Sequence, residues 1–192
     1  MTKTRLEAFS DGVLAIVITI MVLELKVPHD ISFHALWRLG PVFISYVLSF
    51  VFVGIYWGNH HHLLHTVQRV SSRIIWANMA LLFALSLIPF TTGWMGENNF
   101  ARLPVAVYAI NLLFCSINFY ILQKVIITVG TKDSALIDAL RKQEKKGITS
   151  LLVYAASVGI AFIYPFISAF LFAVMAVWWL IPNKNIEKAL EE

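Results

Sequence analysis

Residues 5–23 of this chain read RLEAFSDGVLAIVITIMVL, a charged segment followed by an uninterrupted apolar run. Asp11 lies directly before that run, and a charged side chain in a bilayer costs about 2.5–3.5 kcal/mol at mid-depth on insertion scales. Because Asp11 is near one end of the run, its cost is smaller, but the carboxylate still needs polar partners. An ionisable residue in a membrane helix also raises the expectation of an ion pathway.

The composition of the whole chain favours a membrane protein. Of its 192 residues, 59% are hydrophobic and 14% are charged, whereas soluble domains carry about 25% charged residues. The single cysteine, Cys115, excludes a disulfide framework and a cysteine metal site within the chain. The net charge of +4 is not accompanied by a basic stripe with interleaved aromatic residues, so nucleic acid is not an expected partner.

Six apolar segments predict helices that cross the bilayer, which requires about 20 mostly apolar residues for a full span. They cover residues 6–25, 41–57, 74–94, 103–122, 148–163 and 166–181, and the second is expected to continue as a helix beyond Trp57. The last two are short, and Tyr164-Pro165 between them permits a tight hairpin. One long broken helix is the alternative, but about 34 residues at 1.5 Å each would span about 51 Å, far more than the hydrocarbon core. We therefore expect an all-α, six-span polytopic fold that forms a single domain over residues 1–192.

The distribution of basic residues predicts the orientation of these spans. With both termini in the cytoplasm, the inner segments hold twelve Lys and Arg residues and the outer segments hold three, namely Lys26, Arg38 and Arg102. We therefore expect a multi-pass protein of the cell membrane with both termini cytoplasmic. The start of the chain has no small-residue cleavage site of a signal peptide, so the first helix is expected to remain.

The longest polar stretch, residues 131–147, predicts a short helix at the membrane interface. Its expected start is Asp133 or Ser134, and its expected end is Gly147. Leu136 and Leu140 would share one face of this helix. No polar stretch is long enough to form a separate soluble domain.

The first helix carries a stripe of side chains at helical spacing. At about 100° per residue, Ser10 and Asp11 lie on a different side of the helix from this stripe. The stripe consists of Phe9, Ile16, Thr19, Ile20 and Leu23. If it lines an ion pathway, Ser10 and Asp11 point into the bundle of the subunit and bond to other helices. Contact with lipid or with a neighbouring helix would fit the same spacing.

Three groups of residues resemble one family of membrane proteins. They are Arg5-x-x-x-Phe9-Ser10-Asp11-Gly12 followed by Ala15-Ile16 and Thr19, then Asn59-His60-His61-His62, and then Trp76-Ala77-Asn78 with Ser86-Leu87-Ile88-Pro89-Phe90. This pattern resembles the signature of the transmembrane protein 175 family of potassium channels. The motifs cover about residues 5–89, and the remainder of the chain agrees with the family by the number of spans.

The resemblance implies a potassium-selective channel of the leak type. It implies a homotetramer in the lipid bilayer, with the first helix of each subunit lining a central pore for K⁺ and with no cofactor. Rings of apolar side chains would form the constriction, and a threonine layer would contribute to selectivity. At the matching positions of this chain stand Ile16, Thr19, Ile20 and Leu23.

The resemblance also implies a structural or gating network around the first motif, in which Ser10 and Asp11 bond to neighbouring helices. Its other members would be Arg5, Phe9, His61, Trp76 and Asn78. Consecutive residues of a helix point in different directions. The sequence therefore leaves open which of four histidines takes part, and these are His60, His61, His62 and His65.

Two other kinds of protein fit parts of the sequence. In a secondary cation or proton transporter, Asp11 and a histidine would form a proton relay, but such transporters often show internal repeats and facing broken helices, and we find no repeat. In a metal sensor, His61 and His65 would share a helix face, but no Asp, Glu or Cys lies close in sequence to complete a tetrahedral site. The sequence has no nucleophile–base pair and no phosphate-binding glycine loop, so an enzyme is not expected.

Overall fold

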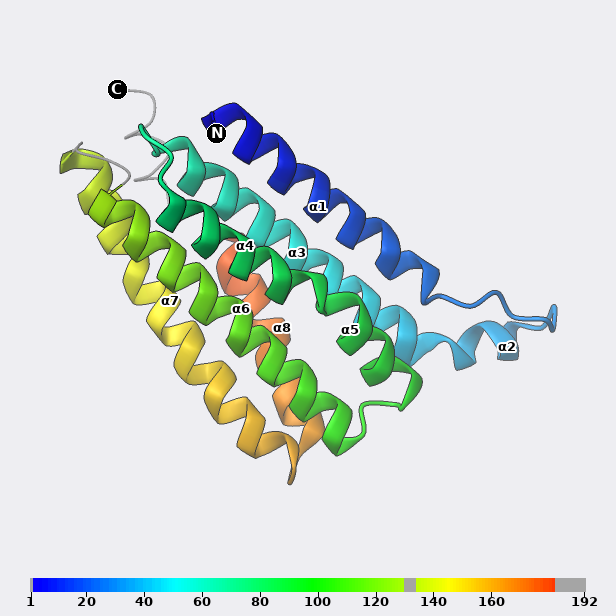
Figure 1. Ribbon diagram of the computed structural model, residues 1–192. Coiled ribbons are helices and arrows are strands. Elements are labelled where there is room, and N and C mark those ends of the chain that lie inside the picture. Colours follow the sequence, from blue (N-terminus) through cyan, green and yellow to red (C-terminus); the bar gives the residue numbers. More distant parts are fainter. Residues whose placement is uncertain (1, 130–133, 182–192) are drawn as a thin grey trace.

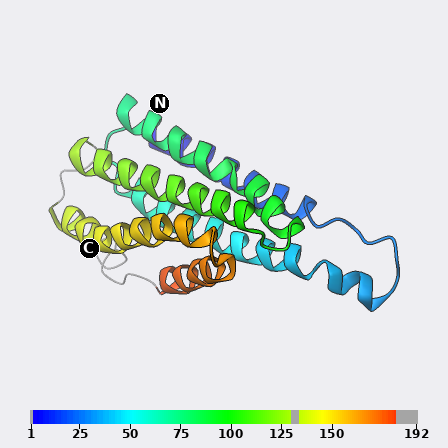
Figure 2. The same ribbon diagram turned by 90° about the horizontal axis from the view of Figure 1, so that it is seen from below.

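The computed structural model describes residues 2–129 and 134–181, and these residues form a helical bundle (Figure 1). Its helices are α1 (Lys3–Leu23), α2 (Phe33–Arg38), α3 (Gly40–His65), α4 (Ser72–Ser86), α5 (Ile88–Glu97), α6 (Arg102–Val129), α7 (Ser134–Ala161) and α8 (Pro165–Leu180). Helix α1 lies along one edge of the bundle in Figure 1, and α7 lies along the opposite edge. Figure 2 shows that the segment with α2, between α1 and α3, extends beyond the other helices.

Four helical stretches in the described part of the chain are long and apolar enough to cross a membrane. They are Lys3–Leu23, Gly40–His65, Ser72–Glu97 and Arg102–Val129. Helix α8 is also apolar but is shorter, and α7 is polar in its first half and apolar in its second half. The prediction of an all-α membrane fold is therefore confirmed.

Helices α6 and α7 run in opposite directions and are joined by polar side chains. The Gln123 amide donates to the carbonyl oxygen of Leu140 at 2.6 Å, and the Tyr120 hydroxyl donates to the Glu144 carboxylate at 3.0 Å. Glu144 also pairs with Lys124 at 2.7 Å. The hydrogen bond from Lys124 holds the pKa of the Glu144 carboxyl below its ordinary value. These contacts hold the polar first half of α7 on α6.

The prediction that a short helix ends at Gly147 is wrong, because α7 continues without interruption to Ala161. The helix begins at Ser134, one of the two expected start positions, whereas Asp133 lies outside the described residues. A glycine inside a helix costs only about 1 kcal/mol relative to alanine. The contacts of α7 with α6 offset this cost, so packing overrides the local stop signal.

The chain reverses direction between α7 and α8, as Tyr164-Pro165 predicts. The Ser168 hydroxyl donates to the carbonyl oxygen of Ser157 at 2.9 Å, and the Trp179 indole donates to the Ser150 hydroxyl at 2.8 Å. Residue numbers rise on α8 as they fall on α7, so the two helices are antiparallel. Pro165 is in the first turn of α8, where a backbone N–H is not needed. The two helices form a hairpin and are not one broken helix.

A kink at Leu87 divides the third membrane-length stretch into α4 and α5. Pro89 follows the kink, and proline has no N–H and collides with the carbonyl group four residues earlier. Asn111 of α6 binds the backbone at this point. In the amide orientation that pairs donors with acceptors, its nitrogen donates to the Ala84 carbonyl at 3.0 Å and its oxygen accepts from the Ile88 N–H at 3.2 Å. The kink is therefore held by a side chain from a neighbouring helix.

Helix α5 lies close to the backbone of α3 at Gly96. A Cβ atom on Gly96 would lie 2.7 Å from the Cα atom of Val42 and would also collide with the Ser45 hydroxyl. Nearby, the Thr92 hydroxyl donates to the Ser49 hydroxyl at 2.7 Å. Small residues and hydrogen bonds between helices are the usual means of close packing in membranes. Gly96 is therefore required by the distance between α3 and α5.

We predict that Gly96→Ala destabilises the protein by about 1–3 kcal/mol, because an added methyl group would overpack the contact and the backbone at Val42 cannot rotate away. Thermal unfolding of the purified protein in detergent measures this loss. The matched control is Gly159→Ala in α7, where no atom lies within 4 Å of the added methyl. This control should unfold at the same temperature as the parent or slightly higher. Equal losses in the two variants would contradict the packing argument.

Candidate functional site

Helix α1 has one side packed in the bundle and one side left uncovered. The packed side carries Leu6, Ser10, Leu14, Val17 and Met21, which recur every three or four positions. On the opposite side, Ile16 is 58% exposed and Leu23 is 74% exposed. Phe9, Thr19 and Ile20 are exposed beside them. In a membrane protein, an uncovered apolar face of this kind contacts lipid or other chains. We call it the free face of α1.

All four predicted constriction residues, Ile16, Thr19, Ile20 and Leu23, lie on the free face. The Thr19 hydroxyl donates to the carbonyl oxygen of Ile16 at 2.9 Å. A hydroxyl group has one hydrogen and two lone pairs, so its oxygen keeps acceptor capacity after this bond. Such an oxygen can bind a cation directly, whereas the isoleucine and leucine side chains can only exclude water.

On its packed side, α1 is joined to α4 and α3 by a chain of hydrogen bonds. The Asn78 amide of α4 donates to the Ser10 hydroxyl at 2.9 Å, and Ser10 donates in turn to the carbonyl oxygen of Leu6 at 2.8 Å. The amide oxygen of Asn78 lies 2.6 Å from Nε2 of His60 on α3. Because an amide oxygen only accepts, the hydrogen of this bond is on Nε2 of His60. The three polar side chains are buried, so each depends on the others for its partners.

Asp11 has a different hydrogen-bond partner from Ser10. Its carboxylate accepts a hydrogen bond from the indole nitrogen of Trp57 on α3 at 3.0 Å. The His61 ring lies beside that indole, with 6.2 Å between the ring centroids. Asp11 is only partly buried, so the carboxylate is at the edge of the packed side and keeps access to its surroundings.

The histidine in the network differs from the one named from the sequence. His60 bonds to Asn78, whereas His61 is exposed and lies next to His62 and His65. Consecutive residues differ by about 100° around a helix, and only the packing of α3 on α4 decides which of them points inward. Among the residues that the structure describes, no group of three metal-binding side chains could hold an ion.

The tryptophan partner also differs from the prediction. Trp57 bonds to Asp11, whereas Trp76 is 74% exposed and points away from the bundle. Arg5 and Phe9 of the first motif are exposed as well and lie on the free face, outside the network. Trp76 was expected in the network because the Trp76-Ala77-Asn78 motif resembles the family, but residues two positions apart on a helix do not share a face.

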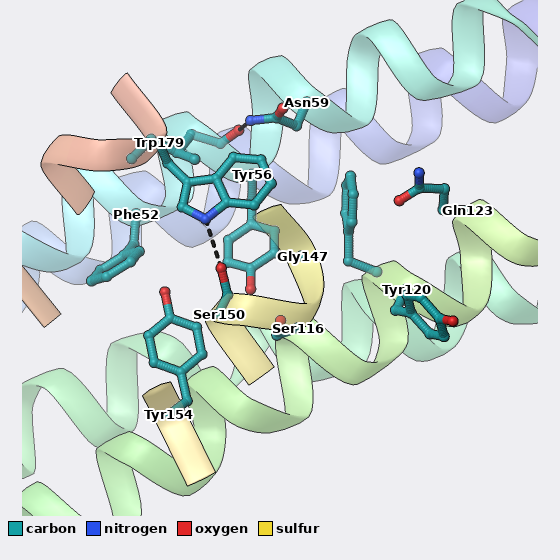
Figure 3. A pocket seen from close by; sticks show the side chains of 12 residues that line it. Phe52, Tyr56, Asn59, Ser116, Tyr120, Gln123, Gly147, Ser150, Tyr154 and Trp179 are labelled. Atoms are coloured by element: carbon teal, nitrogen blue, oxygen red, sulfur yellow. Dashed lines mark hydrogen bonds between the residues drawn. The ribbon is translucent and has the colours of Figure 1, made fainter. Parts of the chain in front are cut away.

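A small pocket lies inside the subunit between α3, α6, α7 and α8 (Figure 3). Figure 3 shows the Tyr56 and Tyr154 hydroxyls directed into it, with Trp179 on one side. The free space is about 30 Å³, which is room for roughly two water molecules. No residue of α1 lines this pocket. The pocket is therefore separate from the free face.

Comparison with known protein families gives a match over the first part of the chain. Residues 5–89 match the family model described as endosomal/lysosomal potassium channel TMEM175. This range contains all of α1 except its first two residues, the network of Ser10, Asn78 and His60, and the kink before α5.

Comparison with individual proteins extends the similarity over the whole chain. A potassium channel of Chryseobacterium sp. (strain P1-3) is 50% identical over 192 residues, which is 100% of both chains. A potassium channel of Streptomyces collinus (strain DSM 40733 / Tue 365) is 31% identical over 83% of this chain and 82% of its own length. The crystal structure of a lysosomal potassium-selective channel TMEM175 homolog from Chamaesiphon minutus matches with a TM-score of 0.84 and 32% identity, over 94% of this chain and 97% of that chain.

We predict that Asn78→Ala lowers the stability of the protein by about 1–3 kcal/mol for each partner left unsatisfied. The variant removes the donor to Ser10 and the acceptor of His60 at once, and both are buried. Asp11→Ala should cost less, because the carboxylate is only partly buried. Thermal unfolding in detergent, followed by size-exclusion chromatography, measures both effects.

The matched control for this prediction is Trp76→Phe on the exposed side of the same helix. It should leave the unfolding temperature unchanged. The network would not have the importance that we assign to it if Asn78→Ala and Trp76→Phe unfolded at the same temperature.

Proposed function

The chain belongs to the TMEM175 family of potassium channels, and we propose that it forms a homotetrameric channel whose central pore is lined by α1. K⁺ would pass down its gradient, with no cofactor and no second coupled ion. The protein is a channel and not an enzyme. Residues 1–192 would form one channel subunit of the cell membrane, with both termini in the cytoplasm.

The observation that supports this proposal most directly is the free face of α1. One helix cannot enclose a pathway, so a pore lined by α1 needs several copies of it around an axis. The uncovered side chains of Ile16, Thr19, Ile20 and Leu23 would meet there. Ile16 and Leu23 are about 10 Å apart along the helix, and rings of branched apolar side chains can exclude water and block ions. The Thr19 oxygens would lie between these rings as ligands for a partly dehydrated cation.

Six membrane crossings fit this arrangement. Helices α1, α3, α4 with α5, and α6 have the length of full spans. The apolar second half of α7 and the whole of α8 would supply the fifth and sixth as a short hairpin. An even number of crossings agrees with the excess of basic residues in the segments assigned to the cytoplasm.

The geometry gives less support to a secondary transporter. A proton relay from Asp11 to a histidine would need a contact between two groups that titrate. Asp11 instead accepts from the Trp57 indole, and His60 bonds to Asn78. Neither an indole nor an amide ionises near neutral pH, so these contacts do not form a relay of titrating groups.

Ion flux into liposomes that contain only the purified protein tests the proposed function. K⁺ flux that is large, driven by the gradient alone and greater than Na⁺ flux is expected. Slow flux that requires a second ion would favour a transporter. Native mass spectrometry of the same preparation should give the mass of four subunits, and a monomer or dimer that still conducts would contradict the proposed assembly.

We predict that Ile16→Asn and Leu23→Asn raise the K⁺ conductance and weaken the preference for K⁺ over Na⁺. The amide would remove the barrier to wetting and would hydrate either cation. Single-channel recording in planar bilayers measures both quantities.

The matched control for these variants is Ile110→Asn on α6, because Ile110 is apolar and 49% exposed but lies outside the proposed pore. Val17, which is next to Ile16 in the chain, is not suitable because it is 4% exposed and belongs to the core. Unchanged currents in Ile16→Asn and Leu23→Asn, with altered currents in Ile110→Asn, would mean that the pore face is wrongly assigned.

We predict that Thr19→Val lowers the preference for K⁺ over Na⁺. Valine keeps the shape of threonine but removes the hydroxyl oxygen, so the proposed ring of ligands is lost. Reversal potentials under bi-ionic conditions measure this preference. Thr19→Ser, which keeps the oxygen, should retain most of the preference, and equal selectivity in Thr19→Val and the parent would refute the role of the hydroxyl.

A further inference from the structure

We propose that Glu24 sets the K⁺ conductance of this channel at low ionic strength by concentrating cations at the outer mouth of the pore. This inference rests on the proposed function, because it requires α1 to line the pore. It concerns the rate at which ions arrive, and not the selection of K⁺ over Na⁺.

The position of Glu24 at the end of α1 is the first support for this role. It is the C-cap residue of the helix and follows Leu23 directly. It also lines an open groove beside the free face, together with Ile16 and Ile20 of α1 and Pro89 of α5. With both termini in the cytoplasm, this end of α1 faces the outside. A carboxylate here is next to the last proposed apolar ring on its outer side.

The side chain of Glu24 lies against α5 at Gly93. A Cβ atom on Gly93 would lie 2.8 Å from one carboxylate oxygen of Glu24 and 3.1 Å from its carboxyl carbon. The carboxylate therefore rests against α5 at Gly93 and is partly buried. Its charge therefore stays close to the end of the proposed pore helix.

The nearest basic residue in the chain, Lys26, is paired with another carboxylate. Lys26, two residues after Glu24, forms an ion pair with Glu97 at the end of α5. Three ion pairs join residues in the described part of the chain, and none of them includes Glu24. Lys26 is therefore bonded to Glu97 and acts on Glu24 only through a weaker Coulombic attraction.

The end of α1 adds to this negative potential. A helix C-terminus carries about half a negative charge from its last carbonyl groups, and the last turn of α1 holds no basic residue. In a homotetramer, four such helix ends and four Glu24 carboxylates would surround the outer mouth. An opening lined by charges of one sign raises the local concentration of counter-ions and their rate of arrival by about 10-fold or more.

Single-channel recording at two salt concentrations tests the proposal. Charge effects extend about 30 Å at about 10 mM salt but only about 3 Å at about 1 M. Glu24→Gln should therefore lower the conductance about threefold or more in dilute KCl and leave it nearly unchanged in concentrated KCl. Its K⁺ over Na⁺ preference should equal that of the parent, and Glu24→Asp, which keeps the charge, should conduct like the parent.

Variants of the Lys26–Glu97 ion pair test whether the conductance changes in the direction that the added or removed charge predicts. Glu97→Gln leaves Lys26 unpaired and should lower the conductance in dilute KCl, whereas Lys26→Gln leaves Glu97 unpaired and should raise it. The matched control is Asp30→Asn, which removes the same charge as Glu24→Gln but on the exposed segment before α2. There Asp30 accepts hydrogen bonds from the backbone and hydroxyl of Ser32. In dilute KCl this control should lower the conductance clearly less than Glu24→Gln does.

Three results would overturn the proposal. They are a Glu24→Gln conductance equal to that of the parent in dilute KCl, a loss of the same size at both salt concentrations, and an Asp30→Asn effect as large as that of Glu24→Gln. A protein that carries no K⁺ current in any variant would instead contradict the proposed function.

Discussion

The buried hydrogen bond from Asn78 to Ser10 decides which side of α1 faces the bundle. Ser10 has its hydroxyl hydrogen committed to its own helix, so it needs an outside donor, and Asn78 is that donor. The same amide holds His60, which ties α3 into the arrangement. If α1 rotated by one residue, or about 100°, Ser10 would lose this partner and apolar side chains would replace it. The rotation of α1 is therefore set by a polar contact, and the free face is what remains on the other side.

Helix α5 holds the C-terminal end of α1 through different contacts. The kink before Pro89 redirects the helix, and Asn111 binds the backbone groups that the kink releases. Gly96 brings α5 against α3, and Gly93 leaves space for Glu24. The pair of Lys26 with Glu97 then ties the segment after α1 to the end of α5. The two ends of α1 are thus fixed independently, the N-terminal half by buried hydrogen bonds and the C-terminal end by close packing and charge.

The remaining helices support this arrangement without contributing to the free face. Helices α6, α7 and α8 are joined by polar pairs such as Gln123 with Leu140 and Trp179 with Ser150. They also enclose the small pocket beside Tyr154. Stable packing on that side allows α1 to keep an uncovered apolar face, which would be unfavourable in water but is suited to lipid and to other copies of the chain.

The sequence by itself determined the helical class, the membrane character and the family, because apolar segment length, charge distribution and the motif around Asp11 are local properties of the chain. It also indicated the stripe of Ile16, Thr19, Ile20 and Leu23, since helical periodicity alone places these residues together. Only the tertiary structure decided that His60 and Trp57, rather than His61 and Trp76, are the partners of Asn78 and Asp11, because this depends on how α3 and α4 are rotated against α1. The tertiary structure also decided that α7 continues beyond Gly147, because packing on α6 outweighs the weak preference of glycine to end a helix. It likewise placed Glu24 against Gly93, which is 69 positions away in the chain.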